Sequence, residues 1–437
     1  MIWIYRILFL PLFLISCPYY FGRMIRRGGY AKDFSHRFGC VPALPPRRAG
    51  THRLWIQAVS VGETEAVVPL LRAFKERGDV EVVLTTTTST AYKIIREKYA
   101  DLVTAYACFP MDFLPFSAKA WRRFDPSAAV LMEGELWPEH IAQARSRGVP
   151  VFVVNARLSD RSFRRWRASG FIARRLLAQI DFFCAGTRND FARFRALGVP
   201  AEKIALTGNM KFDAAAGDAF GEADAVALKK ELGFPPDAPV LLGSSTWPGE
   251  EAMLLETFAR ARERVRDLRL LICPRHAERR AEIVALLEKT AWRWFLRSRT
   301  KPEDVPADAD VCVADTTGEL RRLTHLAQLA FIGKSLPPNN GGQTPIECAA
   351  VGVPAVYGPA MTNFKDVCRS LEDCGAAVKV RDAAAAREKL LALLADPAAR
   401  AEMSSAAQAW HRGNQGATAR VIAFFESVFS GERTRVK

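Results

Sequence analysis

Acidic residues follow two apolar runs in the first half of the chain, at positions where catalytic groups often lie in folds that alternate strands and helices. Glu63 comes directly after LWIQAVSVG (54–62), and Glu133 and Glu135 follow AAVLM (128–132). A carboxylate at such a turn can take a proton from a hydroxyl, and two carboxylates around one glycine can bind a hydroxyl or a cation. Two plainer interpretations stay open. Glu63 could only stabilise the start of the following helix, and Glu133 and Glu135 could be ordinary loop acids.

Polar turns in the second half of the chain are suited to anions. GSST (243–246) combines hydroxyls with the start of a helix, and Arg275 after LRLLICP places a permanent positive charge where a phosphate could bind. DTTGEL (315–320) and the glycine-rich GKSLPPNNGGQTPIE (333–347) add backbone N–H groups, and Glu347 could accept hydrogen bonds from ribose hydroxyls. Each turn alone is a weak signal, but four together predict a nucleotide site.

Parallel sheets are needed to bring these turns to common edges. Short β-type runs alternate with helical ones, which predicts an α/β protein with two doubly wound sheets covered by helices on both faces. A third polar segment, Asn155 to Ser159, follows the run PVFVVNA. The expected strands lie at 54–60, 80–88, 128–132, 150–156, 181–186, 203–208, 240–245, 268–274, 309–315, 329–333 and 354–358.

A stretch rich in Ala, Gly, Asp and Pro separates the two series of strands. It predicts a linker at 213–239 between a first domain at 28–212 and a second at 240–437, with an anchor at 1–27 before them. We expect a cleft between the carboxyl ends of the two sheets, and the final helix (417–429) is a candidate to pack back on the first domain.

The N-terminal segment has the composition of a membrane anchor. ILFLPLFLISCPYYFG (7–22) is an uncharged run between Arg6 and Arg23 that ends in aromatic residues. It is short for a full span, which takes about 20 residues, so a shallow anchor and a span both stay open. The basic residues after it predict a cytoplasmic body by the positive-inside rule. A buried core helix is the plainer alternative.

The excess positive charge of the chain lies in two blocks. The 437 residues carry a formal net charge of +15, of which residues 1–50 hold +7 and residues 151–200 another +7. This pattern favours an anionic partner, either nucleic acid or a phospholipid surface. The chain is 49% hydrophobic and 25% charged, which excludes disordered and collagen-like classes. Nine isolated cysteines and six dispersed histidines lack metal-ligand spacing, so we assign no metal and expect a reducing compartment.

Nine segments resemble, in order and approximate spacing, motifs of the 3-deoxy-D-manno-octulosonic acid (Kdo) transferases, which attach Kdo to lipid A precursors. The resemblance runs from the N-terminal segment to about residue 370. The segments are SVGETEAVVPL, MEGELWPE, NARLSDRSF, GNMKFD, GSSTWPGEE, CPRHAER, DTTGEL, GGQTPIE and GPAMTNFKDV.

The resemblance implies a GT-B fold of two Rossmann-like domains and an inverting transfer of Kdo from CMP-Kdo to a lipid A precursor of the lipid IVA type. The reaction would belong to lipopolysaccharide biosynthesis and need no metal or cofactor. The resemblance also implies monotopic attachment to the cytoplasmic face of the cell inner membrane. An anionic leaflet rather than nucleic acid would then be the partner of the basic blocks.

The resemblance also assigns roles to individual residues. Glu63 resembles the general base, and Glu133 and Lys211 resemble groups that stabilise the transition state, where a cation can offset charge on the departing phosphate. The segments that resemble the family's CMP site contain Pro274, Arg275, Gly318, Glu319, Leu320, Thr344, Pro345, Ile346 and Glu347.

Some positions depart from the family's usual pattern. Lys334 stands in GKS where GGS is common, and Thr344 stands where the last CMP segment commonly begins with Asn. Gln57 and Ala360 stand where His is common. These differences leave the expected reaction intact and concern the shape of the nucleotide pocket.

The second basic block directly follows the NARLS motif. We expect it to face the bilayer and the phosphates of the acceptor, and a solvated arginine face is the alternative. Its residues are Arg161, Arg164, Arg165, Arg167, Arg174 and Arg175, with Trp166 and Phe171 interleaved.

Two other functions stay open at this point. A sugar-nucleotide epimerase could use the same fold, but it needs neither a membrane anchor nor a basic surface that faces an acceptor. A non-catalytic protein that binds anionic membranes would explain both basic blocks, but neither Glu63 nor the glycine-rich turns.

Overall fold

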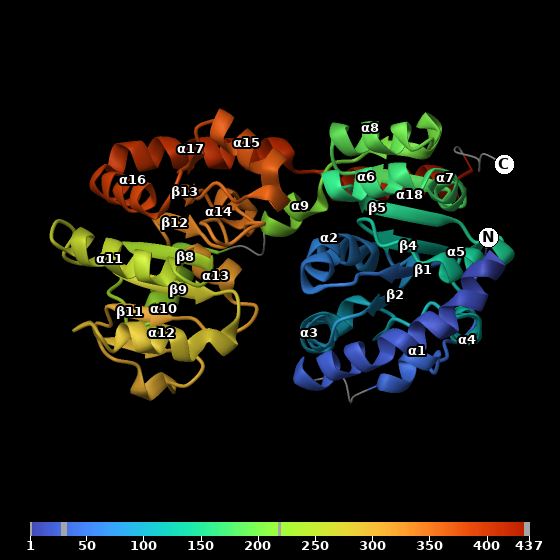
Figure 1. Ribbon diagram of the computed structural model, residues 1–437, viewed down its shortest axis with the longest axis horizontal. Coiled ribbons are helices and arrows are strands. Elements are labelled where there is room, and N and C mark those ends of the chain that lie inside the picture. The colour runs from blue at the N-terminus through green and yellow to red at the C-terminus, as the bar shows by residue number, and fades with distance from the viewer. Residues whose placement is uncertain (1, 28–32, 217–219, 432–437) are drawn as a thin grey trace. The chain divides into compact units, whose positions relative to one another are not determined.

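The computed structural model describes residues 2–27, 33–216 and 220–431, without the side chains of residues 21, 23–27 and 216. The chain divides into two compact units, of which unit 1 comprises Met1–Ala214 with Gln415–Lys437 and unit 2 comprises Ala215–Asn414. Each unit contains one seven-stranded sheet (Figure 1). The expected α/β fold with two doubly wound sheets is confirmed.

The sheet of unit 1 is parallel throughout, in the order β3-β2-β1-β4-β5-β6-β7. The chain runs outward in one direction from β1 and in the other from β4. Ligands bind at such a change of direction in open α/β sheets. The strands are β1 (His52–Gln57), β2 (Val80–Thr86), β3 (Ala105–Cys108), β4 (Ala128–Met132), β5 (Val151–Ala156), β6 (Phe182–Ala185) and β7 (Ile204–Leu206).

Helices cover both faces of this sheet because alternate residues of its strands are apolar on both sides. Within β1, Leu54 and Ile56 join one buried cluster and Trp55 joins the other. The helices are α1 (Ile2–Arg27), α2 (Val61–Arg77), α3 (Ser89–Ile94), α4 (Leu114–Phe124), α5 (Pro138–Ser146), α6 (Asp160–Ala168), α7 (Gly170–Leu177), α8 (Arg188–Ala196), α9 (Met210–Ala216) and α18 (Ala417–Phe429).

The last helix, α18, belongs to unit 1, although its sequence comes after the whole of unit 2. Phe425 packs against Phe152 of β5 with ring centroids 4.5 Å apart. Asp213 accepts hydrogen bonds from the backbone N–H groups of Gly416 (2.7 Å) and Thr418 (2.5 Å), which fixes the start of α18. The helix thus covers one face of the sheet that carries β1 and β4.

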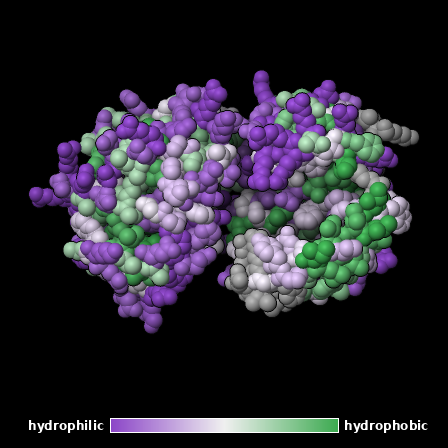
Figure 2. Space-filling model, in the orientation of Figure 1, coloured by the Kyte–Doolittle hydropathy of each residue, from purple (hydrophilic) through white to green (hydrophobic). Residues whose placement is uncertain are grey.

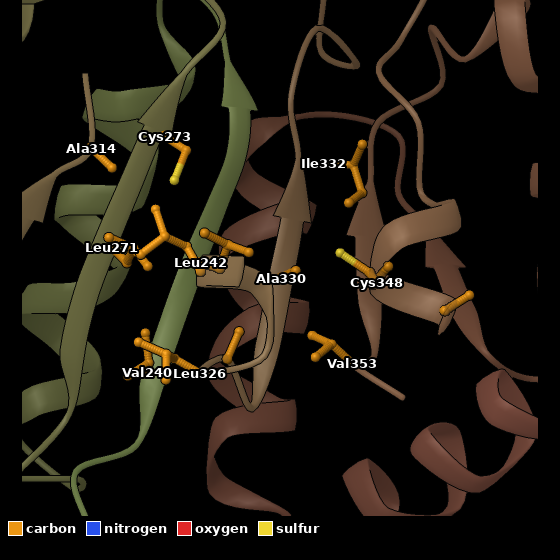
Figure 3. Packing of buried hydrophobic residues seen from close by; sticks show 14 of the residues in the cluster. Val240, Leu242, Leu271, Cys273, Ala314, Leu326, Ala330, Ile332, Cys348 and Val353 are labelled. Carbon is orange, nitrogen blue, oxygen red and sulfur yellow. The ribbon is translucent and has the colours of Figure 1, made fainter. Parts of the chain in front are cut away.

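The sheet of unit 2 is also parallel, in the order β10-β11-β9-β8-β12-β13-β14, and its chain changes direction between β8 and β12. Figure 3 shows side chains of β8, β9 and β12 in one apolar layer, with Cys348 nearby. The strands are β8 (Val240–Thr246), β9 (Arg269–Pro274), β10 (Trp294–Leu296), β11 (Val311–Val313), β12 (Leu329–Ile332), β13 (Ala355–Tyr357) and β14 (Ala377–Lys379).

The expected linker at 213–239 differs from the structure, because much of it is part of unit 2. The helix α10 (Glu222–Glu231) lies within it, and its Leu228 packs with Leu232 and Phe234 in the core of that unit. The other helices of unit 2 are α11 (Glu250–Arg262), α12 (Arg280–Leu287), α13 (Leu320–Thr324), α14 (Ile346–Ala350), α15 (Lys365–Asp373), α16 (Ala383–Ala395) and α17 (Pro397–Asn414).

The N-terminal helix α1 lies against unit 1 and is long and apolar enough to cross a membrane over Ile2–Tyr20. Arg6 donates two hydrogen bonds, of 2.7 and 2.9 Å, to Glu139, a carboxylate that is 0% exposed. Tyr5 donates a hydrogen bond of 2.6 Å to Asp112. Since a buried carboxylate is costly without its partner, these contacts hold the start of α1 on the body of the unit.

The outward side of α1 is apolar and uncovered. Figure 2 shows this side as a hydrophobic stripe on unit 1. A buried core helix would not have such a surface, so this alternative is wrong. The basic residues that follow the apolar run of the anchor are Arg23, Arg26, Arg27, Lys32 and Arg37, of which Lys32 lies outside the described residues. The exposed side chains include Trp3, Ile4, Ile7, Leu8, Leu12, Leu14, Ile15, Tyr19 and Tyr20.

Candidate functional site

The acidic candidates of unit 1 lie on both sides of the point where its strand order reverses. Glu63 follows β1 and Glu133 follows β4, and these two strands are neighbours in the sheet. The carboxyl ends of parallel strands meet at one edge, so the fold brings together two acids that are 70 positions apart in the sequence.

Glu63 is a buried carboxylate in the first turn of α2, with 8% of its surface exposed. It accepts hydrogen bonds from the backbone N–H of Val59 (2.8 Å) and the hydroxyl of Ser60 (3.2 Å). Burial raises its pKa to about 7, and the charges of Glu133 and Glu135 raise it too, although both hydrogen bonds oppose the shift. Glu63 therefore supports the helix start and also has the pKa of a base that works near neutral pH.

Glu133 forms an ion pair with Lys211. The Lys211 ammonium lies 2.5 Å from one carboxylate oxygen, and the Arg157 guanidinium lies 3.7 Å from the other. Glu133 has a φ of 58°, which is strained for a residue with a side chain and is typical of functional sites. Burial and the charge of Glu133 raise the pKa of Glu135. The edge thus holds a negative and a positive group beside a candidate base.

Two asparagines position Lys211. The buried side chain of Asn155, at the end of β5, accepts a hydrogen bond of 3.2 Å from the backbone N–H of Met210. Asn209 accepts one of 3.0 Å from the N–H of Lys211 itself. Asn155 also has a positive φ, of 52°. Of the other polar residues noted after β5, Ser159 caps the N-terminus of α6, which is a structural role.

The carboxyl edge of unit 2 is built by close contact between the ends of β8 and β12. A Cβ at Gly333 would collide with the carbonyl oxygen of Ser245, so this crossing requires glycine. Ser245 and Lys334 both have positive φ values, of 53° and 58°. The backbone N–H of Arg275 donates to the carbonyl of Thr246 (3.1 Å), which places β9 at the same edge.

The predicted nucleotide residues differ in what their side chains can offer. Arg275 is exposed, and no described residue forms an ion pair with it. The carboxylate of Glu319 accepts hydrogen bonds from Arg297 (3.0 and 2.8 Å). Burial raises its pKa, but the hydrogen bonds from Arg297 and Thr316 together with the charges of Arg297 and Arg322 lower it overall. The backbone of this turn, with Gly318 at a φ of 86° and Leu320 at the start of α13, is therefore better suited to a ligand than the paired carboxylate of Glu319.

The last predicted nucleotide segment is mostly buried. Pro345 and Ile346 are buried, and Glu347 is partly exposed in the first turn of α14. The hydroxyl of Thr344 accepts a hydrogen bond of 3.2 Å from the N–H of Ile346. Pro274 ends β9 and is partly exposed. The catalytic candidates Glu63, Glu133 and Lys211 thus belong to unit 1. All the candidates for nucleotide binding belong to unit 2.

Glu250 is a residue that the sequence did not single out. It is 1% exposed and accepts hydrogen bonds from the backbone N–H groups of Trp247 (2.9 Å), Lys334 (2.9 Å), Ser335 (2.9 Å) and Leu336 (3.2 Å). It therefore joins the end of β8 to the loop after β12. Two acids at the start of a helix are common, so its position alone carried no such signal.

Among the described residues, no group of three or more His, Cys, Asp or Glu side chains could hold a metal ion. Asp308 and Asp310, an acidic pair with the spacing of a DxD metal motif, bond to arginines. Asp308 pairs with Arg269 and with Arg293, and the buried Asp310 lies 3.2 Å from Arg262. These acids brace β9 and β11.

Comparison with known proteins agrees with the motifs. A family model described as "3-Deoxy-D-manno-octulosonic-acid transferase (kdotransferase)" matches residues 32–214. The chain is 37% identical to the "3-deoxy-D-manno-octulosonic acid transferase" of Bordetella pertussis, over 92% of this chain and 93% of that one. It is 30% identical to the protein of the same name from Haemophilus influenzae, over 95% and 93%.

A solved structure of similar fold is the UDP-GlcNAc 2-epimerase from Neisseria meningitidis bound to UDP-GlcNAc. It covers 86% of this chain and 100% of its own with a TM-score of 0.61, but only 14% of residues are identical. This likeness concerns the fold alone, whereas the two transferases share sequence over nearly their whole length. The chain therefore belongs to the family of 3-deoxy-D-manno-octulosonic acid transferases and is a glycosyltransferase.

Proposed function

We propose that the protein transfers Kdo from CMP-Kdo to a hydroxyl of a lipid A precursor, with inversion at the anomeric carbon and Glu63 as general base. The observation that carries this proposal is the buried Glu63, with a pKa of about 7, at the edge that also holds Glu133 and Lys211. The motif resemblance supports CMP-Kdo as donor and a phosphorylated, acylated sugar as acceptor.

In this mechanism Glu63 takes the proton of the acceptor hydroxyl. The oxygen attacks the anomeric carbon of Kdo, the new glycosidic bond forms on the opposite face, and the bond to the CMP phosphate breaks. CMP leaves with the electron pair of that bond. A base whose pKa lies near 7 is suited to this step at neutral pH. It is ionised in part of the molecules and is still basic enough to accept the proton.

Glu133 and Lys211 have linked roles in the proposal. Lys211 would offset the negative charge that develops as CMP departs, and Glu133, 2.5 Å from its ammonium, holds that side chain in place. Arg157 gives Glu133 a second cationic neighbour, at 3.7 Å. No metal or cofactor is part of this mechanism.

The surface of unit 1 supports attachment to a membrane. Besides the apolar side of α1, the helices α6 and α7 expose six arginines together with Phe171 (67% exposed) and Ile172 (60% exposed). Cations beside exposed apolar side chains suit the headgroup region of an anionic bilayer. We propose that α1 lies in the plane of the cytoplasmic face of the inner membrane and that α6 and α7 contact acidic lipid or the acceptor's phosphates.

Reversing two charges on this surface should weaken vesicle binding. We expect Arg164→Glu with Arg165→Glu to reduce binding to vesicles with acidic lipid by at least about tenfold at low salt, because each basic residue near the surface contributes about 1 kcal/mol. The difference should shrink as salt increases. Flotation with acidic and with neutral vesicles measures it.

The matched control for this experiment reverses two exposed arginines of unit 2, Arg264 and Arg266. The control variant should bind acidic vesicles as the wild type does. Equal binding by all three proteins would contradict a role for α6 in membrane contact.

The proposed reaction is tested directly with purified protein, CMP-Kdo and a lipid A precursor. Mass spectrometry should show the acceptor heavier by one or more Kdo residues, and CMP should be released in equal amount. Release of a rearranged sugar from the donor in the absence of acceptor would favour an epimerase instead.

A further inference from the structure

Lys334, directly after β12, has its backbone fixed in a conformation that favours glycine. Its φ is 58°. Its N–H donates to Glu250 (2.9 Å) and its carbonyl accepts from the N–H of Gly342 (3.1 Å). A residue with a side chain costs conformational energy at positive φ, and such strained residues cluster at functional sites. The lysine at this position is therefore a candidate for a functional role.

The ammonium of Lys334 is held over an aromatic ring and has no acidic partner. Its Nζ lies 4.5 Å from the ring centroid of Trp247. In the part of the chain that the structure describes, no carboxylate forms an ion pair with it. Glu250, the acid that contacts its backbone, bonds to four N–H groups instead. The side chain is therefore positioned while its charge stays uncompensated.

A second positive group, Arg275, and the ring of His276 lie at the same edge. Arg275 is exposed at the end of β9, and the ring of His276 packs 5.3 Å from that of Trp247. Burial lowers the pKa of His276, and the charges of Arg275, Arg279 and Lys334 lower it further, although Glu278 opposes them. The surroundings of Trp247 thus favour an anion.

We propose that Lys334 binds an oxyanion of the nucleotide-sugar donor, either its phosphate or the carboxylate of its sugar. This inference rests on the proposed function, which supplies a donor with both groups. The ammonium, placed by the fixed backbone and the Trp247 ring, contacts the anion beside Arg275. Lys334 would then be a residue of the donor site. It would strengthen the binding of ligands that carry the anion and leave the binding of the uncharged nucleoside unchanged.

Two substitutions test the role of the charge. Lys334→Gly suits the positive φ, so the variant should fold at least as well as the wild type, as its Tm will show. Lys334→Met removes the charge and keeps an apolar stem over Trp247. Lys289→Ala, which removes an exposed lysine just after α12, is the matched control.

Isothermal titration calorimetry of the full chain with cytidine, CMP and CMP-Kdo separates the possible outcomes. We expect both Lys334 variants to bind CMP-Kdo about tenfold more weakly than the wild type and the control, with cytidine binding unchanged. A similar loss with CMP assigns the contact to the phosphate, and a loss with CMP-Kdo alone assigns it to the sugar carboxylate.

Two results would overturn the inference, and they separate its failure from the failure of the proposed function. If the wild type binds CMP-Kdo and both variants bind it equally well, Lys334 makes no such contact while the proposed function stands. If the wild type binds neither CMP nor CMP-Kdo and releases no CMP with acceptor present, the proposed function fails, and the inference fails with it.

Discussion

Glu63→Gln should lower the rate of Kdo transfer by about three orders of magnitude and leave the affinity for CMP-Kdo nearly unchanged. The amide keeps the shape and an acceptor for the Val59 N–H, but it cannot take a proton from the acceptor hydroxyl. General bases contribute roughly 10²–10⁴-fold to such rates. Single-turnover transfer with calorimetric donor binding measures the two quantities separately.

The pH profile adds an independent signature for Glu63. Because burial raises its pKa to about 7, the wild-type kcat/KM should rise with pH up to about 7 and then level off. The residual activity of Glu63→Gln should lack this rise. A variant that keeps full activity, or the same pH profile, would contradict the base assignment.

Protein stability provides the control for Glu63→Gln. A carboxyl whose folded pKa lies above its unfolded value stabilises the fold at low pH, and this contribution is lost as pH rises through about 7. The amide has no charge to bury, so the variant should be at least as stable as the wild type at pH 8.

Glu65→Gln, two residues along α2, is the matched substitution and should stay active, since Glu65 bonds to Tyr99 instead.

Lys211→Met should lower kcat by about two orders of magnitude with a much smaller effect on KM for the donor. A cation that meets charge developing in the transition state contributes mainly to kcat, and loss of one such group costs roughly 10²–10³-fold. The backbone of α9 should stay in place, because Asn155 and Asn209 hold it through N–H groups. Steady-state kinetics with both substrates varied measures the effect.

The controls for Lys211 separate its charge from general loss of structure. Lys211→Arg keeps the charge near Glu133 and should recover part of kcat. Lys98→Met removes an exposed lysine elsewhere in unit 1 and should have no effect. An unchanged kcat in Lys211→Met would exclude a role in the transition state and leave only the ion pair with Glu133.

The central strands were predictable from sequence, whereas three of the four edge strands were not. β4 is wholly apolar, and β1 and β8 contain the apolar runs LWI and VLL, because both faces of a parallel strand are buried. β3, β10 and β14 were missed because three or four residues give no periodic pattern. The equally short β7 was found only because it lies within the longer run KIALTG (203–208). The linker at 213–239 was predicted from composition, but the apolar side chains of α10 complete the core of unit 2.

By itself the sequence determined the α/β class, the apolar N-terminal helix, the two basic blocks and, through its motifs, the family. These features depend on local composition and on the order of motifs along the sequence, which do not depend on folding. Tertiary structure decided which polar residues act together. It placed Glu63 and Glu133 after neighbouring strands at one edge of the sheet, raised the pKa of Glu63 to about 7 by burial, and paired Glu133 with Lys211.

Tertiary structure also assigned Glu250 and Lys334 their positions. Eighty-four residues separate them in sequence, and only the neighbouring strands β8 and β12 bring the Glu250 carboxylate to the N–H of Lys334. Burial, charge pairing and backbone strain arise from such distant contacts. No local pattern in the sequence therefore contains them.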